Sequence, residues 1–412
     1  MSRNGLIRIS GCDSIMMIEK IFCKKEFQIP VVFESDDFKD EISKFLTLYI
    51  MELKNAGVSE HVVESVKRFK RSCAYSLSNY LKGIHSNAFD NFEKALDSLQ
   101  ISNSKLLSTT LGSDVMFRGR ENIEPKDYTD DEMYHIPLKM RSAISTERYS
   151  FPGLPCLYAG ASVYTCWVEM NRPSLDRFQV ATIRPTEEAC RIRLYDLSNI
   201  PQRLTELQKY EWFKEDDYLL YWPLLAICSI KANHEGNPFK PEYIFPQFVL
   251  EHILKKKNDN EIVGIKYASI KASLICQKQF DDDWHTYVNY VFPSRSDSMS
   301  GGRCEILNER FPIENNRSGR ELQILTRMLE IDDAKLKIQE EGEDASREEQ
   351  YKTYFNNKNI YTRDGKKYSY KLSVFGMTEM AMLRESFDDL EEESMVMEDI
   401  TSDDLDKVFI EN

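Results

Sequence analysis

Three polar side chains stand at the edges of one apolar unit and could together bind a ligand that carries both phosphate and sugar. Arg148 precedes a short apolar run at residues 156–159, Tyr158 lies inside that run, and Glu169 follows it. Arginine forks onto phosphate oxygens, and a carboxylate accepts hydrogen bonds from sugar hydroxyls. The alternative is that Arg148 and Glu169 are solvated surface residues and that Tyr158 belongs to the core.

The residues around this group predict a turn, a buried strand and then a helix. Residues 152–155 contain two prolines and a glycine, which are typical of a turn. The apolar run that follows has the length of a strand and is broken by Gly160. Ser162 can cap a helix that continues to Glu169. We therefore expect Glu169 on the helix.

A second basic group ends another predicted strand, at residues 115–120. Arg118 and Arg120 fall on the same face of that strand, because side chains alternate along it. Both arginines suit phosphate oxygens, and Gly119 between them would let a ligand approach the backbone. The alternative is an exposed strand end that happens to be basic.

The elements before and after these residues follow from hydrophobic periodicity. Three amphipathic helices are predicted near residues 36–57, 59–80 and 86–99. Further strands are predicted at 178–183, 191–197, 262–269 and 285–292, and helices over 203–230 and after Pro246. Residues 121–146 carry many charges and predict a loop that could cover the site.

The C-terminal part has a different composition. A helix is predicted from Glu321 to Leu336, and a hairpin around Asp364-Gly365. Residues 339–350 are highly charged, and the tail from Asp388 is acidic, so both are predicted to be solvated, disordered or docking segments.

Composition excludes several classes of protein. The formal charge of −14 argues against direct nucleic-acid binding, because phosphate neutralisation needs a basic surface. Nine cysteines without a Cys-x-x-Cys pair and six histidines without ligand spacing predict neither a disulfide scaffold nor a metal site. No apolar stretch approaches the ~20 residues that span a bilayer, and no signal-peptide core follows Met1, so we expect a cytoplasmic protein with no membrane association.

The motifs taken in order resemble the RES domain, which is named for its Arg, Glu and Ser. The resemblance covers about residues 112–295 and uses Arg118 after an aromatic residue, Arg148 before Tyr149, the Pro-Gly-x-Pro-x-Leu-Tyr158 run, Glu169, the Pro-Glu-Tyr-Ile-x-Pro-Gln run from Pro241 to Gln247, and Ser269 after Gly264. The departures are Glu147-Arg148-Tyr149-Ser150 where the family has Gly-Arg-Trp-Asn, and the long additions at both ends.

The resemblance implies a fold like that of ADP-ribosyltransferases and an enzyme that degrades NAD+ as its substrate, with no bound cofactor and no metal. Carried over residue by residue, it implies a catalytic set of Glu169, Arg118 and Ser269. The same resemblance implies that substrate is bound by Arg118, Arg120, Arg148, Tyr149, Tyr158 and Ser269. Glu169 would stabilise the ribosyl cation, the arginines would clamp the pyrophosphate, and Tyr158 or Tyr149 would stack on nicotinamide.

We therefore expect an α+β fold: a RES-like core of mixed β-sheets with flanking helices, preceded by a small α-helical domain. The predicted domains are residues 1–110 (helical), 111–315 (catalytic) and 316–412 (a helical and acidic extension, partly disordered). The N-terminal helices or the acidic end are candidate surfaces for an antitoxin or regulatory protein.

The predicted function is cleavage of the nicotinamide–ribose bond by a glycohydrolase or phosphorylase that acts as a toxin or defence effector. Two alternatives stay open. The chain could transfer ADP-ribose to a macromolecule, or it could be a module that senses a nucleotide without turning it over.

Overall fold

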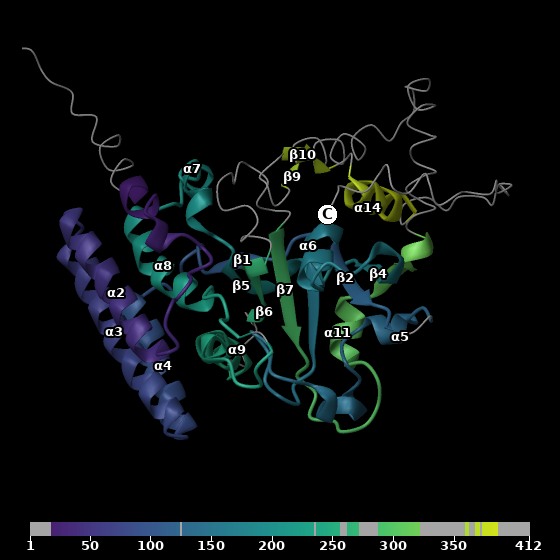
Figure 1. Cartoon of the computed structure of the whole chain (residues 1–412), viewed down its shortest axis with the longest axis horizontal. Helices are drawn as coiled ribbons and strands as arrows, with labels where there is room; N and C mark the ends of the chain where they lie inside the picture. Colours follow the sequence, from purple (N-terminus) through teal and green to yellow (C-terminus); the bar gives the residue numbers. More distant parts are fainter. Residues whose placement is uncertain are drawn as a thin grey trace, which may run out of the picture.

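The computed structural model describes residues 18–123, 126–234, 236–255, 262–271, 287–321, 359–361, 367–370 and 373–385. Figure 1 shows a layer of helices on one side, a mixed sheet in the middle and a smaller group of helices on the other side. The predicted helix over 321–336, the charged stretch 339–350 and the tail from Asp388 lie outside the described residues, apart from the first residue of that helix.

Within the described residues the main sheet has eight strands, in the order β1-β5-β6-β7-β3-β2-β4-β8. Their bounds are β1 Ser108–Thr110, β2 Met116–Glu121, β3 Cys156–Gly160, β4 Phe178–Ile183, β5 Arg193–Leu197, β6 Ile262–Ala268, β7 Val288–Pro293 and β8 Ile313–Arg317. Only β5 and β6 pair in parallel among these strands; the other neighbours are antiparallel. Two further strands, β9, Asn359–Tyr361, and β10, Lys367–Ser369, pair antiparallel, as expected for a hairpin; its predicted turn at Asp364-Gly365 lies outside the described residues.

The helical layer confirms the three periodicities read from the sequence. Its members are α2 Phe38–Asn55, α3 Glu60–Leu81 and α4 His85–Leu99. Asp37 caps α2 by accepting from the Asp40 backbone N–H, and Gly57, with φ +72°, ends the turn after that helix. Each helix buries one apolar stripe, because its large side chains recur at three- and four-residue steps.

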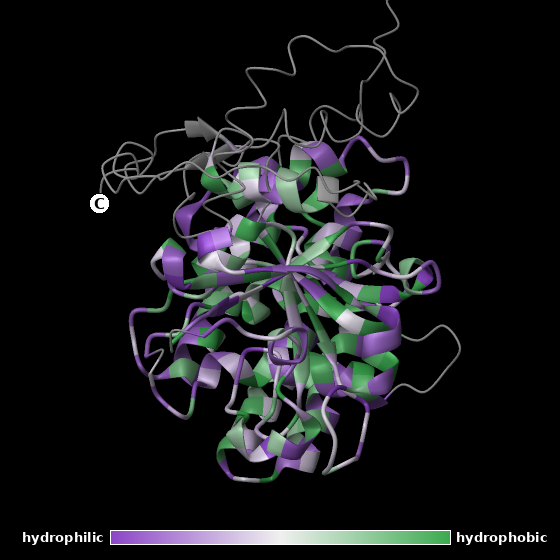
Figure 2. Cartoon of the chain, turned by 90° about the vertical axis from the view of Figure 1, so that its right-hand side faces the viewer, coloured by the Kyte–Doolittle hydropathy of each residue, from purple (hydrophilic) through white to green (hydrophobic). Residues whose placement is uncertain are grey.

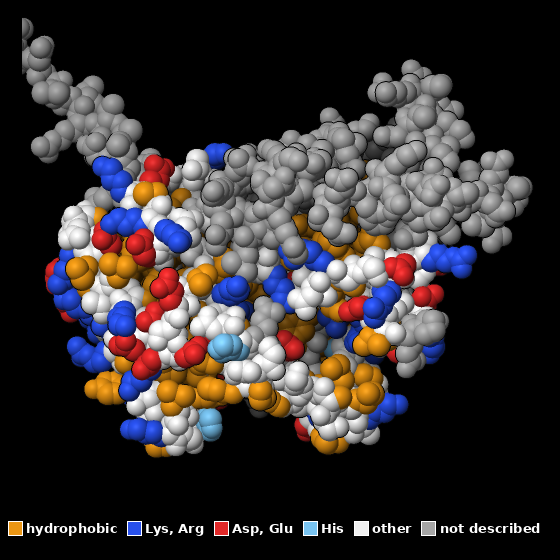
Figure 3. Space-filling model, in the orientation of Figure 1, with side chains coloured by type: hydrophobic (Ala, Val, Ile, Leu, Met, Phe, Trp, Pro, Cys, Tyr) orange, Lys and Arg blue, Asp and Glu red, His pale blue; other side chains and the backbone are white. Residues whose placement is uncertain are grey.

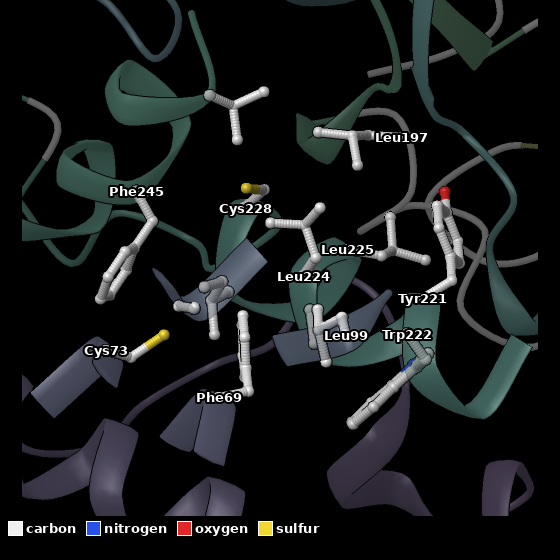
Figure 4. Packing of buried hydrophobic residues seen from close by; sticks show 14 of the residues in the cluster. Phe69, Cys73, Leu99, Leu197, Tyr221, Trp222, Leu224, Leu225, Cys228 and Phe245 are labelled. Carbon is white, nitrogen blue, oxygen red and sulfur yellow. The ribbon is translucent and has the colours of Figure 1, made fainter. Parts of the chain in front are cut away.

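The stripes pack on two further helices, α8 Glu215–Cys228 and α9 Ile244–Lys255. Every residue of α8 from Tyr218 onward is buried, so this helix belongs to the core between the helical layer and the sheet. In Figure 4, Phe69 and Leu99 from the layer lie beside Leu224 and Trp222 of α8. The Tyr49 hydroxyl also donates to the Leu219 carbonyl across this boundary, at 2.9 Å.

On the other side of the molecule, α6, Val163–Glu169, lies against β2 and β3, and α14, Val374–Glu385, packs on α6. The centre of the Phe375 ring, on α14, lies 4.8 Å from the centre of the Trp167 ring and 5.2 Å from that of the Tyr164 ring. Figure 2 shows hydrophobic segments concentrated where strands and helices meet, with hydrophilic loops around them. Residues 374–385 therefore belong to the same hydrophobic core as α6.

The remaining helical elements are short. They are α5 Asp130–Met133, α7 Leu204–Leu207, α11 Glu305–Arg310 and the 3-10 helices Lys25–Phe27, Leu138–Ala143, Leu175–Arg177, Ala189–Arg191, Pro201–Arg203 and Pro241–Tyr243.

The expected α+β class, with a mixed sheet, flanking helices and a helical region in front, is confirmed. Three local expectations are wrong. Residues 121–146 are not a plain loop, since they contain α5 and a 3-10 helix. Residues 208–214 interrupt the helix expected over 203–230. Two strands, β1 and β8, lie where the sequence predicts none. The domain boundaries remain a prediction.

None of the helices in the described ranges is long and apolar enough to cross a membrane. On the face drawn in Figure 3, acidic and basic side chains are intermixed over the helical layer.

Candidate active site

A cavity of about 380 Å³ opens where the central strands meet α6 and the segment before β3. Its walls include Arg118, Arg148, Tyr158 and Glu169, so four residues predicted from the sequence converge on one space. Several unpredicted side chains line it as well: Glu147, Lys231, Tyr243, Tyr267, Lys271 and Asn289.

The Glu169 carboxylate is held in place by two buried donors. The Ser269 hydroxyl donates to Oε1 at 2.6 Å, and the Asn289 side-chain amide donates to the same oxygen at 2.7 Å. Ser269 follows β6 and Asn289 lies within β7, so donors 100 and 120 residues away in the chain fix this carboxylate. In the described part of the chain the other oxygen, Oε2, accepts no hydrogen bond, which leaves it available to a ligand.

Helix α6 places Glu169 at its last position. Ser162 caps the helix as predicted, because its side chain accepts from the Thr165 backbone N–H. Asn171 and Arg172 then adopt φ of +63° and +56°, a left-handed conformation that ends the helix. The Lys271 ammonium donates to the Glu169 carbonyl at 2.9 Å and to the Asn171 side chain at 2.7 Å, which neutralises this helix end.

Two glycines beside the site allow α6 to pack closely on the sheet. A Cβ on Gly119 would come within 2.8 Å of the Phe178 ring and 3.0 Å of the Cys166 Cβ, and one on Gly160 within 2.9 Å of the Cys166 sulfur. Cys166 of α6 thus occupies the space that these glycines leave. Gly119 lets α6 approach the sheet; because it also lines the cavity, its expected role in ligand approach stays a prediction.

Within β2 and β3, Phe117 and Gly160 are the one pair of residues in register. Arg118 comes directly after this pair, at the point where the two strands separate. Its guanidinium donates to the Tyr158 carbonyl at 2.9 Å and to the Met133 carbonyl at 3.3 Å. Burial, with a further contribution from the charge of Arg120, lowers the pKa of Arg118 to about 10, so the group is still cationic at neutral pH. A buried cation beside another cation favours an anionic ligand.

Arg120 lies on the same face of β2 but does not line the cavity. It donates to the Tyr134 carbonyl at 3.0 Å, and its guanidinium lies 5.6 Å from the centre of the Tyr128 ring. Burial lowers its pKa. Arg120 therefore holds segment 126–134 and influences the site through its charge on Arg118.

Arg148 projects from a tight backbone hairpin. Glu147 and Ser150 exchange two backbone hydrogen bonds, at 3.1 and 3.2 Å. The buried Gln247 amide donates to the carbonyls of both residues, at 3.0 and 3.1 Å, and so fixes the hairpin. The Arg148 guanidinium donates to the Cys228 carbonyl at 3.1 Å and lies 4.9 Å from the centre of the Tyr243 ring.

The two predicted tyrosines have different environments. The Tyr158 ring lines the cavity, and its buried hydroxyl has no hydrogen-bond partner among the described residues. Tyr149 is 1% exposed and packs its ring 4.7 Å from the Tyr267 ring, behind the cavity wall. Behind the wall, Tyr149 is out of reach of a ligand in the cavity. Tyr267 lines the cavity in its place.

Ser269 also departs from its expected role. It is 0% exposed and is not part of the cavity wall, because its hydroxyl is directed at Glu169. In this structure the hydroxyl positions the carboxylate and does not face the cavity. Asn289, which shares this role, could have been noticed as the one amide in the otherwise apolar and aromatic run of β7, Val288–Pro293.

Among the described residues, no group of three or more His, Cys, Asp or Glu side chains is placed to hold a metal ion. Burial raises the pKa of the Cys166 thiol, which lies against Arg118, to about 12. That thiol donates to the Phe117 carbonyl and belongs to the packing of α6.

Comparison with known proteins finds a sequence similarity to a curated protein. The chain is 30% identical over 298 residues to a protein of Bacillus subtilis (strain 168) named "Putative toxin YopC". The aligned stretch is 68% of this chain and 65% of YopC, so the chain spans less than two thirds of that protein's length. No protein-family model and no solved structure matches the chain.

Proposed function

We propose that the chain is an NAD+-consuming enzyme of the RES type that cleaves the nicotinamide–ribose bond. One observation carries the proposal. The Glu169 carboxylate is immobilised by Ser269 and Asn289 on the wall of a cavity that also contains Arg118 and Arg148, and its second oxygen is available.

The charges of the cavity suit a dinucleotide. Arg118, Arg148, Lys231 and Lys271 surround a space in which a pyrophosphate could accept hydrogen bonds. The positive nicotinamide ring would lie toward Glu169, because opposite charges attract strongly where water is excluded. The volume is of the size that encloses a small-molecule ligand.

Each residue has a defined part in the reaction. The bond between C1″ of the ribose and the nicotinamide nitrogen breaks, and its electron pair leaves with a neutral nicotinamide. Positive charge then develops on the ribose, as in glycoside hydrolysis. Glu169 Oε2 stabilises that charge and accepts from the ribose hydroxyls, while the arginines hold the pyrophosphate still. An acceptor finally bonds to C1″.

Consumption of NAD+ would make the chain toxic to the cell that contains it, which agrees with the name of the similar YopC. A toxin of this kind needs restraint, and we include a neutralising protein in the proposal. The outer faces of α2 and α3 expose Met51 and Tyr75, by 53% and 59%, and offer one surface for such a partner.

Purified protein incubated with NAD+ is expected to release nicotinamide, which mass spectrometry of the small molecules detects. ADP-ribose beside it indicates a glycohydrolase, and ADP-ribose-1″-phosphate in phosphate buffer indicates a phosphorylase. A labelled adduct on protein or nucleic acid would instead show transfer to a macromolecule. Intact NAD+ that raises the melting temperature would show a sensor and contradict the proposal.

Replacing Asn289 by alanine is expected to lower kcat for nicotinamide release about 10–100-fold with little change in KM, because one charge-assisted hydrogen bond to Glu169 is lost. Replacing it by aspartate removes the same donor and places a like charge beside Glu169, so it should lower kcat at least as much as alanine does. Steady-state kinetics over a pH series measures both. The exposed Asn103→Ala serves as the control, and an Asn289→Ala variant with unaltered kcat would contradict the positioning role.

A further inference from the structure

We propose that Glu147 is a second catalytic carboxylate, which takes the proton of an attacking water and thereby makes water the acceptor. The inference rests on the proposed function and specifies its chemistry as hydrolysis. Glu147 lines the same cavity as Glu169 but was not among the residues predicted from the sequence.

The backbone holds Glu147 rigidly in this position. Its N–H and carbonyl both bond to Ser150, and the Gln247 amide also donates to the Thr146 hydroxyl oxygen, at 2.8 Å. Three consecutive residues, Thr146, Glu147 and Arg148, are therefore fixed by one buried side chain and one tight turn. Rigid backbone around a catalytic group is what general acid–base chemistry requires.

The Glu147 carboxylate is accessible to water, and its pKa is raised. It lines the cavity and is exposed to solvent, and the donor to it among the described residues is the Ser145 hydroxyl at 3.5 Å, too long for a strong hydrogen bond. Desolvation by the cavity walls raises its pKa; the charge of Glu169 acts in the same direction, while Lys240 and Lys271 oppose it. A carboxylate with a raised pKa is a better base at neutral pH.

The two carboxylates would divide the reaction. As nicotinamide leaves with its electron pair, Glu169 stabilises the ribosyl cation. The water oxygen then bonds to C1″, and one water proton passes to Glu147, which returns it to solvent. The products are nicotinamide and ADP-ribose, and no other reactant is consumed. An anionic acceptor such as phosphate would be repelled by Glu147, although Lys231 and Lys271 also line the cavity.

Glu147→Gln tests this division of roles, with Glu309→Gln, an exposed residue of α11, as the matched control. We expect Glu147→Gln to lower kcat about 10²-fold and to lose the acid limb of the pH profile, because the base is gone. Excess sodium azide needs no deprotonation, so it should restore nicotinamide release and yield the ribosyl azide. Glu147→Asp, which keeps a carboxylate, should keep the acid limb.

Three results would overturn the inference, and they can be told apart. A wild-type protein that releases no nicotinamide rejects the proposed function and this inference together. A wild-type protein that is active, with a Glu147→Gln variant that keeps the pH profile and the product ratio in azide or phosphate, rejects only the role of Glu147. ADP-ribose-1″-phosphate as the main product of the wild-type protein in phosphate buffer also rejects it.

Discussion

Glu169→Gln is expected to reduce nicotinamide release on the order of 10²–10³-fold while leaving the protein folded. The loss is large because a carboxylate that stabilises developing positive charge in a water-poor site is replaced by a neutral amide. The measurement is the initial rate of nicotinamide release from NAD+ by liquid chromatography, at saturating and at limiting NAD+.

The fold should tolerate this change for a specific reason. The Ser269 hydroxyl and the Asn289 amide both donate to Oε1, and a glutamine carbonyl in the same place accepts both bonds. What changes is Oε2, which becomes a donor where the substrate requires an acceptor. An unchanged melting temperature with lost activity supports the assignment, whereas full activity in Glu169→Gln would remove the central claim.

Glu379→Ala is expected to lower the free energy of unfolding by about 2–4 kcal/mol, because it leaves buried donors unpaired. The Glu379 side chain is 0% exposed, and its Oε2 accepts from the Val163 backbone N–H at 3.1 Å and from the Tyr370 hydroxyl at 2.5 Å. Val163 is the first residue of α6, so this carboxylate also favours the helix N-terminus.

Urea denaturation followed by circular dichroism measures the change, with Glu309→Ala as an exposed control. Glu379→Gln keeps an acceptor and should cost less than the alanine variant. Because α6 carries Glu169, we also expect nicotinamide release to fall in both Glu379 variants. Equal stability of Glu379→Ala and the wild-type protein would show that α14 does not support the site.

Local signals in the sequence determined much of the framework. Periodic apolar residues placed α2, α3 and α4, and the turn–strand–helix pattern around Tyr158 placed β3 and α6 with Ser162 as its cap. These elements are predictable because their signals lie within one helix turn or one strand repeat. Glu169 and the arginines could be predicted as candidate site residues for the same reason.

The order of the strands and the partners of each side chain were decided only by the tertiary structure. Asn289 and Ser269 meet Glu169 across 120 and 100 residues of chain, and no local pattern encodes such a contact. The same holds for Gln247, which fixes Glu147 from 100 residues away.

Burial decided the roles of the remaining residues. Tyr149 and Tyr158 are alike in the sequence, yet Tyr149 packs against Tyr267 behind the cavity wall, whereas Tyr158 of β3 forms part of that wall. The sequence alone determined which chemical groups this protein carries. The packing of distant strands and helices decided which of them face the cavity, since hydrogen-bond geometry and burial depend on neighbours that the linear order does not specify.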